Sequence, residues 1–222
     1  MKKPFVHSHS ALELFELCPK KFYEEKIAKS VPFVESEQVK WGLDVHKALE
    51  LAVKDKAPLD KRYEMYQEIV DRVSSVQATA YTELKLGVNR DFQCCDFFDS
   101  TCYVRGIADL VLDYGDKIAA LDWKTGKQKH GSRQLTLMAL LLFARFPDVQ
   151  EIYTAYVWLQ SGKLTPESYK REQIEELWEL FIQPMKELEW CLENNVWHPR
   201  ENFLCRNWCG VLDCMYNGRR GK

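Results

Sequence analysis

Two runs of apolar, partly β-branched residues flank a turn sequence near the middle of the chain. The runs cover residues 106–112 and 118–124, and the turn sequence Asp113-Tyr114-Gly115-Asp116 lies between them. This pattern is typical of a β-hairpin. If the turn is centred between Gly115 and Asp116, residue 109 lies opposite residue 122 across the two strands.

Apolar positions elsewhere predict both helices and strands. Positions that repeat every three to four residues predict helices that begin at Ser10, Ser36, Pro58, Ser132 and Glu172, the last interrupted near Pro184. Apolar runs with alternating polarity predict further strands over residues 81–88, 92–98, 153–159 and 163–169. The order strand, strand, helix, strand around the hairpin favours an α/β fold, a central mixed β-sheet flanked by helices.

Composition narrows the class of protein. The 222 residues are 46% hydrophobic and 29% charged, as in a globular protein, and we expect one domain over residues 1–222. The net charge of −2 argues against broad polyanion binding, so any nucleic-acid contact must come from local Lys and Arg clusters. The N-terminus lacks a signal-peptide core, and the longest apolar run, 135–144, is too short to span a membrane. We therefore expect a cytoplasmic protein without a membrane segment.

The predicted hairpin carries the candidate chemistry. Asp109 and Asp122 face each other in the expected register, where like charges destabilise a sheet. A divalent cation such as Mg²⁺ would reverse that effect, because it binds carboxylate oxygens. Lys124 lies on the same face of its strand as Asp122, and could hold an attacking water or stabilise charge on a phosphate. The alternative is that these are ordinary solvent-facing residues.

An Asp on one strand followed by Asp-x-Lys on the next resembles the PD-(D/E)xK nucleases. The sequence Asp122-Trp-Lys-Thr-Gly126 is similar to their RecB-like branch. The resemblance implies a restriction-endonuclease-like core in which His46 and the carbonyl of Trp123 bind Mg²⁺ or Mn²⁺ together with Asp109 and Asp122. It also implies Glu83 as an extra acid of the site. Taken alone, a helical His or a strand Glu is more often a packed or solvent-facing residue.

Residues after the hairpin are candidates for DNA contacts. The basic loop residues Lys127, Lys129 and Arg133 are well placed to hold phosphates, unless the loop is only a solvated connection. Gln134 resembles the first residue of the family's Gln-x-x-x-Tyr motif, which contacts substrate. Met138 stands where that motif has Tyr.

Clustered cysteines suggest a second metal centre. Cys205, Cys209 and Cys214 lie within ten residues, and Cys18 in Cys-Pro-x-x-Phe is the obvious fourth ligand. Iron–sulfur members of the RecB-like branch carry similar cysteines, which implies a 4Fe-4S cluster that ties elements 10–25 and 202–216 together. The spacing Cys-x₃-Cys-x₄-Cys departs from the family's Cys-x₂-Cys-x₅-Cys. Zinc is the alternative, and empty reduced thiols are the simplest reading.

These patterns together predict a metal-dependent DNA nuclease. The metal would lower the pKa of a water that Lys124 positions for attack on a backbone phosphate. The resemblance favours an exonuclease on single-stranded DNA or DNA ends, in recombination, repair or phage DNA processing in bacteria. A helicase or recombination partner is expected, because the chain has no Gly-x₄-Gly-Lys-Ser/Thr motif. The alternatives are a non-catalytic nucleic-acid-binding subunit and a zinc-stabilised structural protein.

Overall fold

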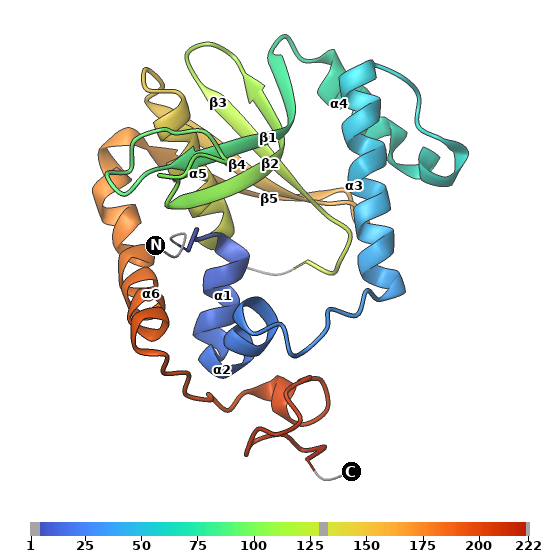
Figure 1. Cartoon of the computed structure of the whole chain (residues 1–222). Coiled ribbons are helices and arrows are strands. Elements are labelled where there is room, and N and C mark those ends of the chain that lie inside the picture. Colours follow the sequence, from blue (N-terminus) through green and yellow to red (C-terminus); the bar gives the residue numbers. More distant parts are fainter. Residues whose placement is uncertain (1–4, 129–132, 221–222) are drawn as a thin grey trace. The chain divides into compact units, whose positions relative to one another are not determined.

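The computed structural model describes residues 5–128 and 133–220, and the chain forms two compact units (Figure 1). Unit 1 comprises residues 1–6 and 35–178, and unit 2 comprises residues 7–34 and 179–222. Each unit is described by itself. Within the described parts of the chain, no helix is long and apolar enough to cross a membrane.

Unit 1 is built on a mixed five-stranded sheet. Its strands are β1 (Thr79–Val88), β2 (Val104–Asp113), β3 (Ile118–Lys124), β4 (Glu151–Trp158) and β5 (Lys163–Lys170). They follow one another in spatial order, and every neighbouring pair is antiparallel except β3 and β4. Parallel neighbours need a crossover, and helix α5 (Arg133–Arg145) supplies it. The predicted mixed α/β fold is confirmed.

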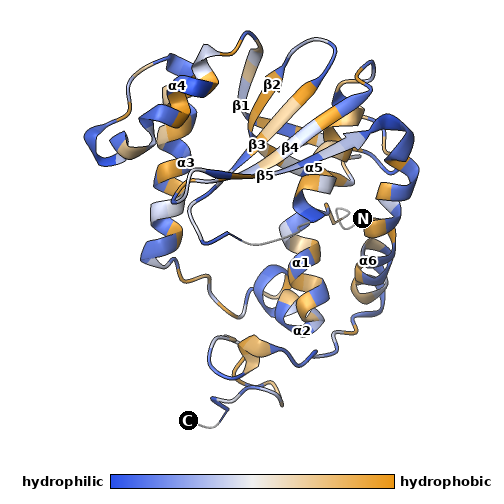
Figure 2. Ribbon diagram, turned by 180° about the vertical axis from the view of Figure 1, so that it is seen from behind, coloured by the Kyte–Doolittle hydropathy of each residue, from blue (hydrophilic) through white to orange (hydrophobic). Residues whose placement is uncertain are grey.

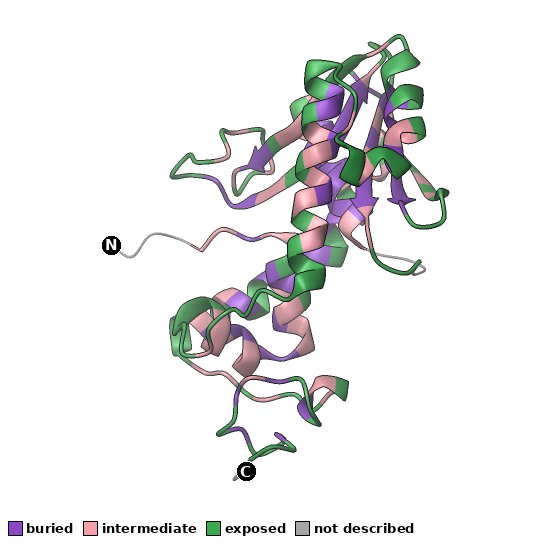
Figure 3. Cartoon of the chain, turned by 90° about the vertical axis from the view of Figure 1, so that its right-hand side faces the viewer, coloured by how far each residue is buried: buried purple, intermediate pink, exposed green. Residues whose placement is uncertain are grey.

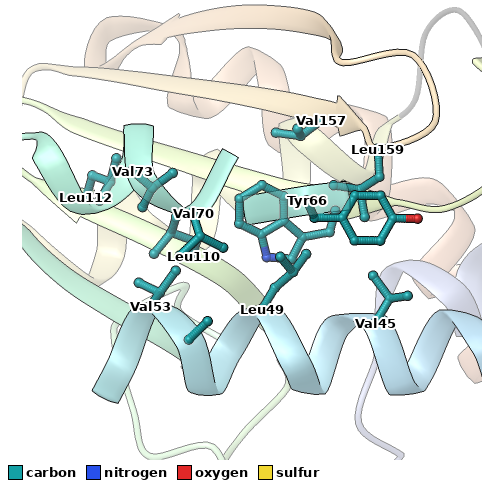
Figure 4. Packing of buried hydrophobic residues seen from close by; sticks show 12 residues of the cluster. Val45, Leu49, Val53, Tyr66, Val70, Val73, Leu110, Leu112, Val157 and Leu159 are labelled. Atoms are coloured by element: carbon teal, nitrogen blue, oxygen red, sulfur yellow. The ribbon is translucent and has the colours of Figure 1, made fainter. Parts of the chain in front are cut away.

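One face of the sheet is covered by α3 (Glu37–Asp55) and α4 (Gln67–Ser75), with a 3₁₀ turn at Lys61–Tyr66 before α4. Ser36 caps α3 by accepting a hydrogen bond from the N–H of Val39, as the sequence predicts for a helix that begins there. Val45 and Leu49 of α3 are fully buried in one hydrophobic cluster with Leu110 of the sheet (Figure 4). Each such side chain contributes about 1.5–3 kcal/mol by its burial. Figure 3 shows the buried residues of this long helix beside exposed ones, as an amphipathic helix requires.

The other face of the sheet is covered by α5, whose residues from Leu135 to Phe143 are all buried. The nearly continuous apolar sequence predicts this burial. The helix approaches β2 so closely that a Cβ at Gly106 would lie 3.0 Å from Leu141 Cδ1. Figure 2 shows hydrophobic residues along the central strands, whereas the turn that connects β2 and β3 is hydrophilic.

The β2–β3 hairpin has the predicted register. Leu110 pairs with Leu121 and Asp113 with Ile118, so the same register places Asp109 opposite Asp122. Gly115 adopts a φ of +90° and donates its N–H to Asp113 Oδ1 at 2.8 Å, which fixes the turn. The ladder ends at Leu110–Leu121, and the N–H of Trp123 donates instead to Asp109 Oδ2 at 2.8 Å.

Two sequence predictions for these elements are wrong. Residues 92–98 form turns with a single bridge, Val88–Cys94, instead of a strand. The side chain of Asn89 accepts hydrogen bonds from the N–H groups of Asp91 and Gln93, which favours turns over a ladder. The final helix, α6 (Ile174–Asn194), follows a 3₁₀ turn at Arg171–Gln173 and continues through Pro184 without interruption.

Unit 2 joins the two ends of the chain. It contains α1 (His9–Leu17), α2 (Pro19–Phe22), a π-helical turn (Tyr23–Ile27), most of α6 and a 3₁₀ turn (Phe203–Cys205). Cys18 ends α1 and precedes Pro19, as the sequence predicts. Phe22 packs edge-on against Phe15 and stacks on Trp197, so residues from both ends form one core.

Candidate active site

Five elements of unit 1 bring the candidate residues together, beside the middle of β1 and β2 and the end of β3. The side chains come from α3, β1, β2, β3 and the first turn of α5, and they are His46, Glu83, Asp109, Asp122, Lys124 and Gln134. The basic loop is described only in part. Lys127 is exposed and Arg133 is the half-buried first residue of α5, while Lys129 and the expected cap Ser132 lie outside the described residues.

His46, Glu83 and Asp109 form a group that could hold a metal ion. One ligand atom from each lies within 4.8 Å of the other two. His46 Nδ1 is 3.4 Å from Asp109 Oδ2, the oxygen that also accepts the N–H of Trp123. An imidazole with two carboxylates suits Mn²⁺, and carboxylates suit Mg²⁺.

Glu83 reaches this group through an unusual backbone conformation. Its φ is +49°, in the left-handed region, which costs a non-glycine residue about 1–2 kcal/mol. The pairs Thr82–Leu110 and Leu84–Ala108 place Glu83 opposite Asp109. Strain of this kind persists where the surrounding structure enforces it, and functional sites are where it concentrates. Burial, the charge of Asp109 and that of Glu50 raise the pKa of Glu83.

Asp122 is the most buried acid of the site. Only 6% of its surface is exposed, and its carboxylate accepts a 2.6 Å hydrogen bond from Gln134 Nε2 and lies 2.5 Å from Lys124 Nζ. Burial and the charge of Asp109 raise the pKa of Asp122 to about 6, even though Lys124 lowers it. A group so placed releases its proton at neutral pH only at a cost in stability.

His46 is held between acids. Burial lowers the pKa of His46, but the carboxylates of Asp109 and Asp122 and a hydrogen bond to the backbone of Trp123 outweigh burial and raise it. A protonated imidazole cannot ligate a metal, so a cation and a proton compete for this side chain.

Gln134 connects the acid, the lysine and an aromatic residue. Its Oε1 accepts hydrogen bonds from Lys124 Nζ at 3.1 Å and from the hydroxyl of Tyr156 at 3.2 Å. The ammonium of Lys124 also lies 4.8 Å from the centre of the Tyr156 ring. Gln134 therefore fixes Asp122 and Lys124 relative to each other.

Sequence reasoning missed Tyr156. The residue is on β4, far along the chain from Gln134, and the position at which the family motif has Tyr holds the buried Met138. Tyr156 reaches the site because the parallel ladder pairs it with Asp122. Since this ladder depends on the crossover through α5, no local sequence signal marks the tyrosine.

The four candidate cysteines lie in unit 2, around one narrow cavity. All four, Cys18, Cys205, Cys209 and Cys214, are buried. Backbone N–H groups of Lys21 and Arg200 point at the sulfur of Cys18, at 3.5 and 3.4 Å, and that of Asn202 lies 3.4 Å from the sulfur of Cys205. Burial raises the pKa of Cys209.

Comparison with known proteins adds the family. Residues 6–214 match the model of the PD-(D/E)XK nuclease superfamily. The chain belongs to this superfamily. Membership in the PD-(D/E)XK superfamily indicates a metal-dependent nuclease, a hydrolase with DNA as its substrate.

Solved structures agree with the fold of a PD-(D/E)XK nuclease. The crystal structure of the protein SSO0001 matches over 98% of this chain and 89% of its own, with a TM-score of 0.51 and 15% sequence identity. A Eubacterium rectale protein, provisionally named an exonuclease, matches over 91% of this chain and 86% of its own, with a TM-score of 0.57 and 12% identity. At these identities both show the fold alone. No curated protein matches the chain in sequence.

Proposed function

We propose that this protein is an exonuclease that hydrolyses single-stranded DNA or DNA ends with Mg²⁺ or Mn²⁺. One observation carries the proposal: His46, Glu83 and Asp109 converge within 4.8 Å, and Asp109 also raises the pKa of Asp122, the acid that pairs with Lys124. A solvent-facing hairpin would not bury its acids in this way.

The donor set decides which cofactor fits. His46, Glu83 and Asp109 would hold the cation, with Asp122 and the carbonyl of Trp123 as further oxygen donors. The imidazole favours Mn²⁺, whereas the carboxylates accept either ion. When bound, a divalent cation lowers the pKa of a coordinated water and offsets the charge of the phosphate.

The remaining steps fall to the side chains of this chain. The Lys124 ammonium, held by Asp122 and Gln134, orients the attacking water and stabilises negative charge on the phosphate oxygens. Arg133, the first residue of α5, and Lys127, in the loop before it, contact the phosphates beside the cleaved bond. We assign Lys129 the same role. Gln134 and Tyr156 keep the lysine in place.

The choice of substrate rests on resemblance. The Asp122-Trp-Lys-Thr-Gly126 sequence is similar to that of RecB-like nucleases, which commonly act on strands and ends, and a structural neighbour is provisionally named an exonuclease. We therefore assign the protein to recombination, repair or phage DNA processing, with unwinding supplied by a helicase or recombination partner.

We further propose that Cys18, Cys205, Cys209 and Cys214 hold a 4Fe-4S cluster. The four sulfurs line one cavity, and three backbone N–H groups point at them, as is favourable for bound thiolates. A single Zn²⁺, with Zn–S bonds of about 2.3 Å, is the alternative occupant of these four cysteines.

The cluster is tested by anaerobic purification, metal analysis and absorption spectroscopy. A 4Fe-4S protein is brown, absorbs near 400 nm and contains about four iron atoms per chain. Cys205→Ser should lose the colour and the iron, while Cys191→Ser, a buried cysteine of unit 2 away from this cavity, should keep both. Zinc in a colourless wild type would replace the cluster with a structural zinc site.

Nuclease activity is tested with end-labelled single-stranded DNA and Mn²⁺, Mg²⁺ or a chelator. The wild type and the hairpin-turn control Asp116→Asn should release label only with metal, while Asp109→Asn and Lys124→Met should not. Labels at the 5′ and 3′ ends give the polarity, and a circular strand should resist an exonuclease. Bound but intact DNA in every reaction would mean a non-catalytic binding subunit. Cleavage that survives in Asp109→Asn and Lys124→Met would refute the assigned site.

A further inference from the structure

A second cavity, of about 500 Å³, lies in unit 2 and belongs to neither of the sites above. Residues from α1, α6 and the segment that follows α6 line it, among them Phe15, Lys186, Glu187, Trp190, His198 and Arg200. Its volume is in the range of small-molecule and cofactor sites.

The aromatic wall of this cavity combines a buried ring with a solvent-exposed one. Phe15 is 2% exposed and is held edge-on by Phe22 at 5.7 Å. Trp190 is 53% exposed, although its helix is anchored nearby by the fully buried Leu188. A large aromatic ring on the rim of a cavity offers a flat face for stacking at little cost in conformational entropy.

The charge of the lining is mainly positive. Lys186, His198 and Arg200 contribute basic groups, whereas Glu187 is the acid and accepts a hydrogen bond from Gln183. Within residues 5–128 and 133–220, the side chains of Lys186 and His198 have no hydrogen-bond or ion-pair partner. The guanidinium of Arg200 donates a hydrogen bond to the backbone carbonyl of Glu16, and this bond orients the side chain. In a chain with a net charge of −2, this grouping of basic residues is local.

We propose that the cavity binds one nucleotide unit of the DNA strand, with the base stacked on Trp190 and the phosphate held by Lys186, His198 and Arg200. This proposal rests on the proposed nuclease function. Exposed aromatic faces interleaved with basic groups are the usual means of binding a single strand without reading its sequence, since every base has a π-face. An acidic peptide would satisfy the cations but would leave the aromatic face unused.

Binding is measured without catalysis, as the fluorescence anisotropy of a labelled oligo(dT) strand in the presence of a chelator. Trp190→Ala should weaken binding about 5- to 100-fold, the range expected for the loss of one stacked base, and Trp190→Phe should restore most of it. Lys186→Ala should weaken binding and reduce the slope of log K against log salt by about one. The matched controls Trp208→Ala and Lys26→Ala, exposed residues of unit 2 outside the cavity, should bind as the wild type.

The outcomes separate this proposal from the nuclease itself. Metal-dependent cleavage by the wild type, together with unchanged binding by Trp190→Ala and Lys186→Ala, would overturn the nucleotide site alone. A strand with abasic positions that binds as tightly as oligo(dT) would overturn base stacking. Displacement of the strand by poly-glutamate but not by thymidine monophosphate would assign the cavity to an acidic peptide. Circular dichroism of each variant excludes a folding defect.

Discussion

Replacing Asp122 with Asn should remove a loss of stability that the metal-free protein suffers as pH rises, although it also removes a residue of the candidate active site. The carboxyl group of Asp122 is 6% exposed and faces the charge of Asp109, and its pKa is about 6 instead of the ordinary 3.8. Ionising this group in the folded state therefore costs free energy that the unfolded chain does not lose. Asn has nearly the same shape and no charge to ionise. Its single oxygen can accept from either Gln134 or Lys124 but not from both, so the substitution also loses one contact at every pH.

The size and pH dependence of the gain follow from linkage. A folded pKa of about 6 against 3.8 corresponds to about 3 kcal/mol when the group is fully ionised in both states. Because the folded protein holds the proton more tightly than the unfolded chain, the wild type loses stability as pH rises from about 4 to about 7. Between pH 5 and pH 8 the wild type should lose about 1.4 kcal/mol of its free energy of unfolding, roughly half of the total effect. Asp122→Asn should not show this loss.

Urea unfolding at pH 5 and pH 8, with a chelator, measures this difference, and comparing the two pH values cancels pH-independent effects of the substitution. Asp116→Asn, the same chemical change at an exposed turn position of the hairpin, is the control and should show no comparable gain. Adding Mn²⁺ at pH 8 should stabilise the wild type more than Asp122→Asn, because the cation compensates the charge. An advantage of Asp122→Asn that is equal at both pH values would refute the idea of a buried, costly carboxylate.

Substitutions at three further residues test other parts of unit 1. Tyr156→Phe removes one hydrogen bond to Gln134 and should lower kcat about 2- to 10-fold with KM for DNA nearly unchanged, as measured by steady-state cleavage. Glu83→Gly should relieve the strain of the left-handed backbone and raise stability in thermal unfolding by up to about 1 kcal/mol. Calorimetry should show that Glu83→Gly binds Mn²⁺ more weakly. Glu83→Gln should also lose Mn²⁺ binding, but without the gain in stability from the relieved backbone. Arg171→Ala removes hydrogen bonds to three backbone carbonyls around the end of α5 and should cost about 2–4 kcal/mol in urea unfolding, with cleavage per folded molecule unchanged.

Local patterns in the sequence predict much of the fold, because a turn sequence sets the hairpin and an apolar run marks the buried helix. The turn at Gly115 sets the register of the hairpin, and that register alone brings Asp109 and Asp122 to opposite positions. The buried α5 is readable from its continuous apolar run. The strand expected over residues 92–98 is wrong because side chains such as Asn89 offer the backbone hydrogen bonds that a ladder would otherwise supply.

The candidate site is less predictable, since its finer geometry depends on contacts between strands that are not neighbours in sequence. Glu83 is expected in the site only from the resemblance to the family, and its left-handed φ is a property of the folded sheet. Tyr156 carries no signal at all, because only the parallel β3–β4 ladder brings it beside Asp122. The spacing of the cysteines predicts that they cluster, and their common cavity depends on the two chain ends packing together in unit 2.

Protons and a cation are two ways of relieving the same crowding of acids. The pKa values of His46, Glu83 and Asp122 are all raised, because a proton on any of these groups lowers the electrostatic repulsion among the carboxylates. A divalent cation does this more completely, but it must displace those protons, so its binding strengthens as pH rises. Lys124 is already held by Asp122 and Gln134 and needs no rearrangement when the cation arrives. The repulsion among the acids therefore favours binding of the cation, whereas Lys124 is already positioned to stabilise charge on the phosphate.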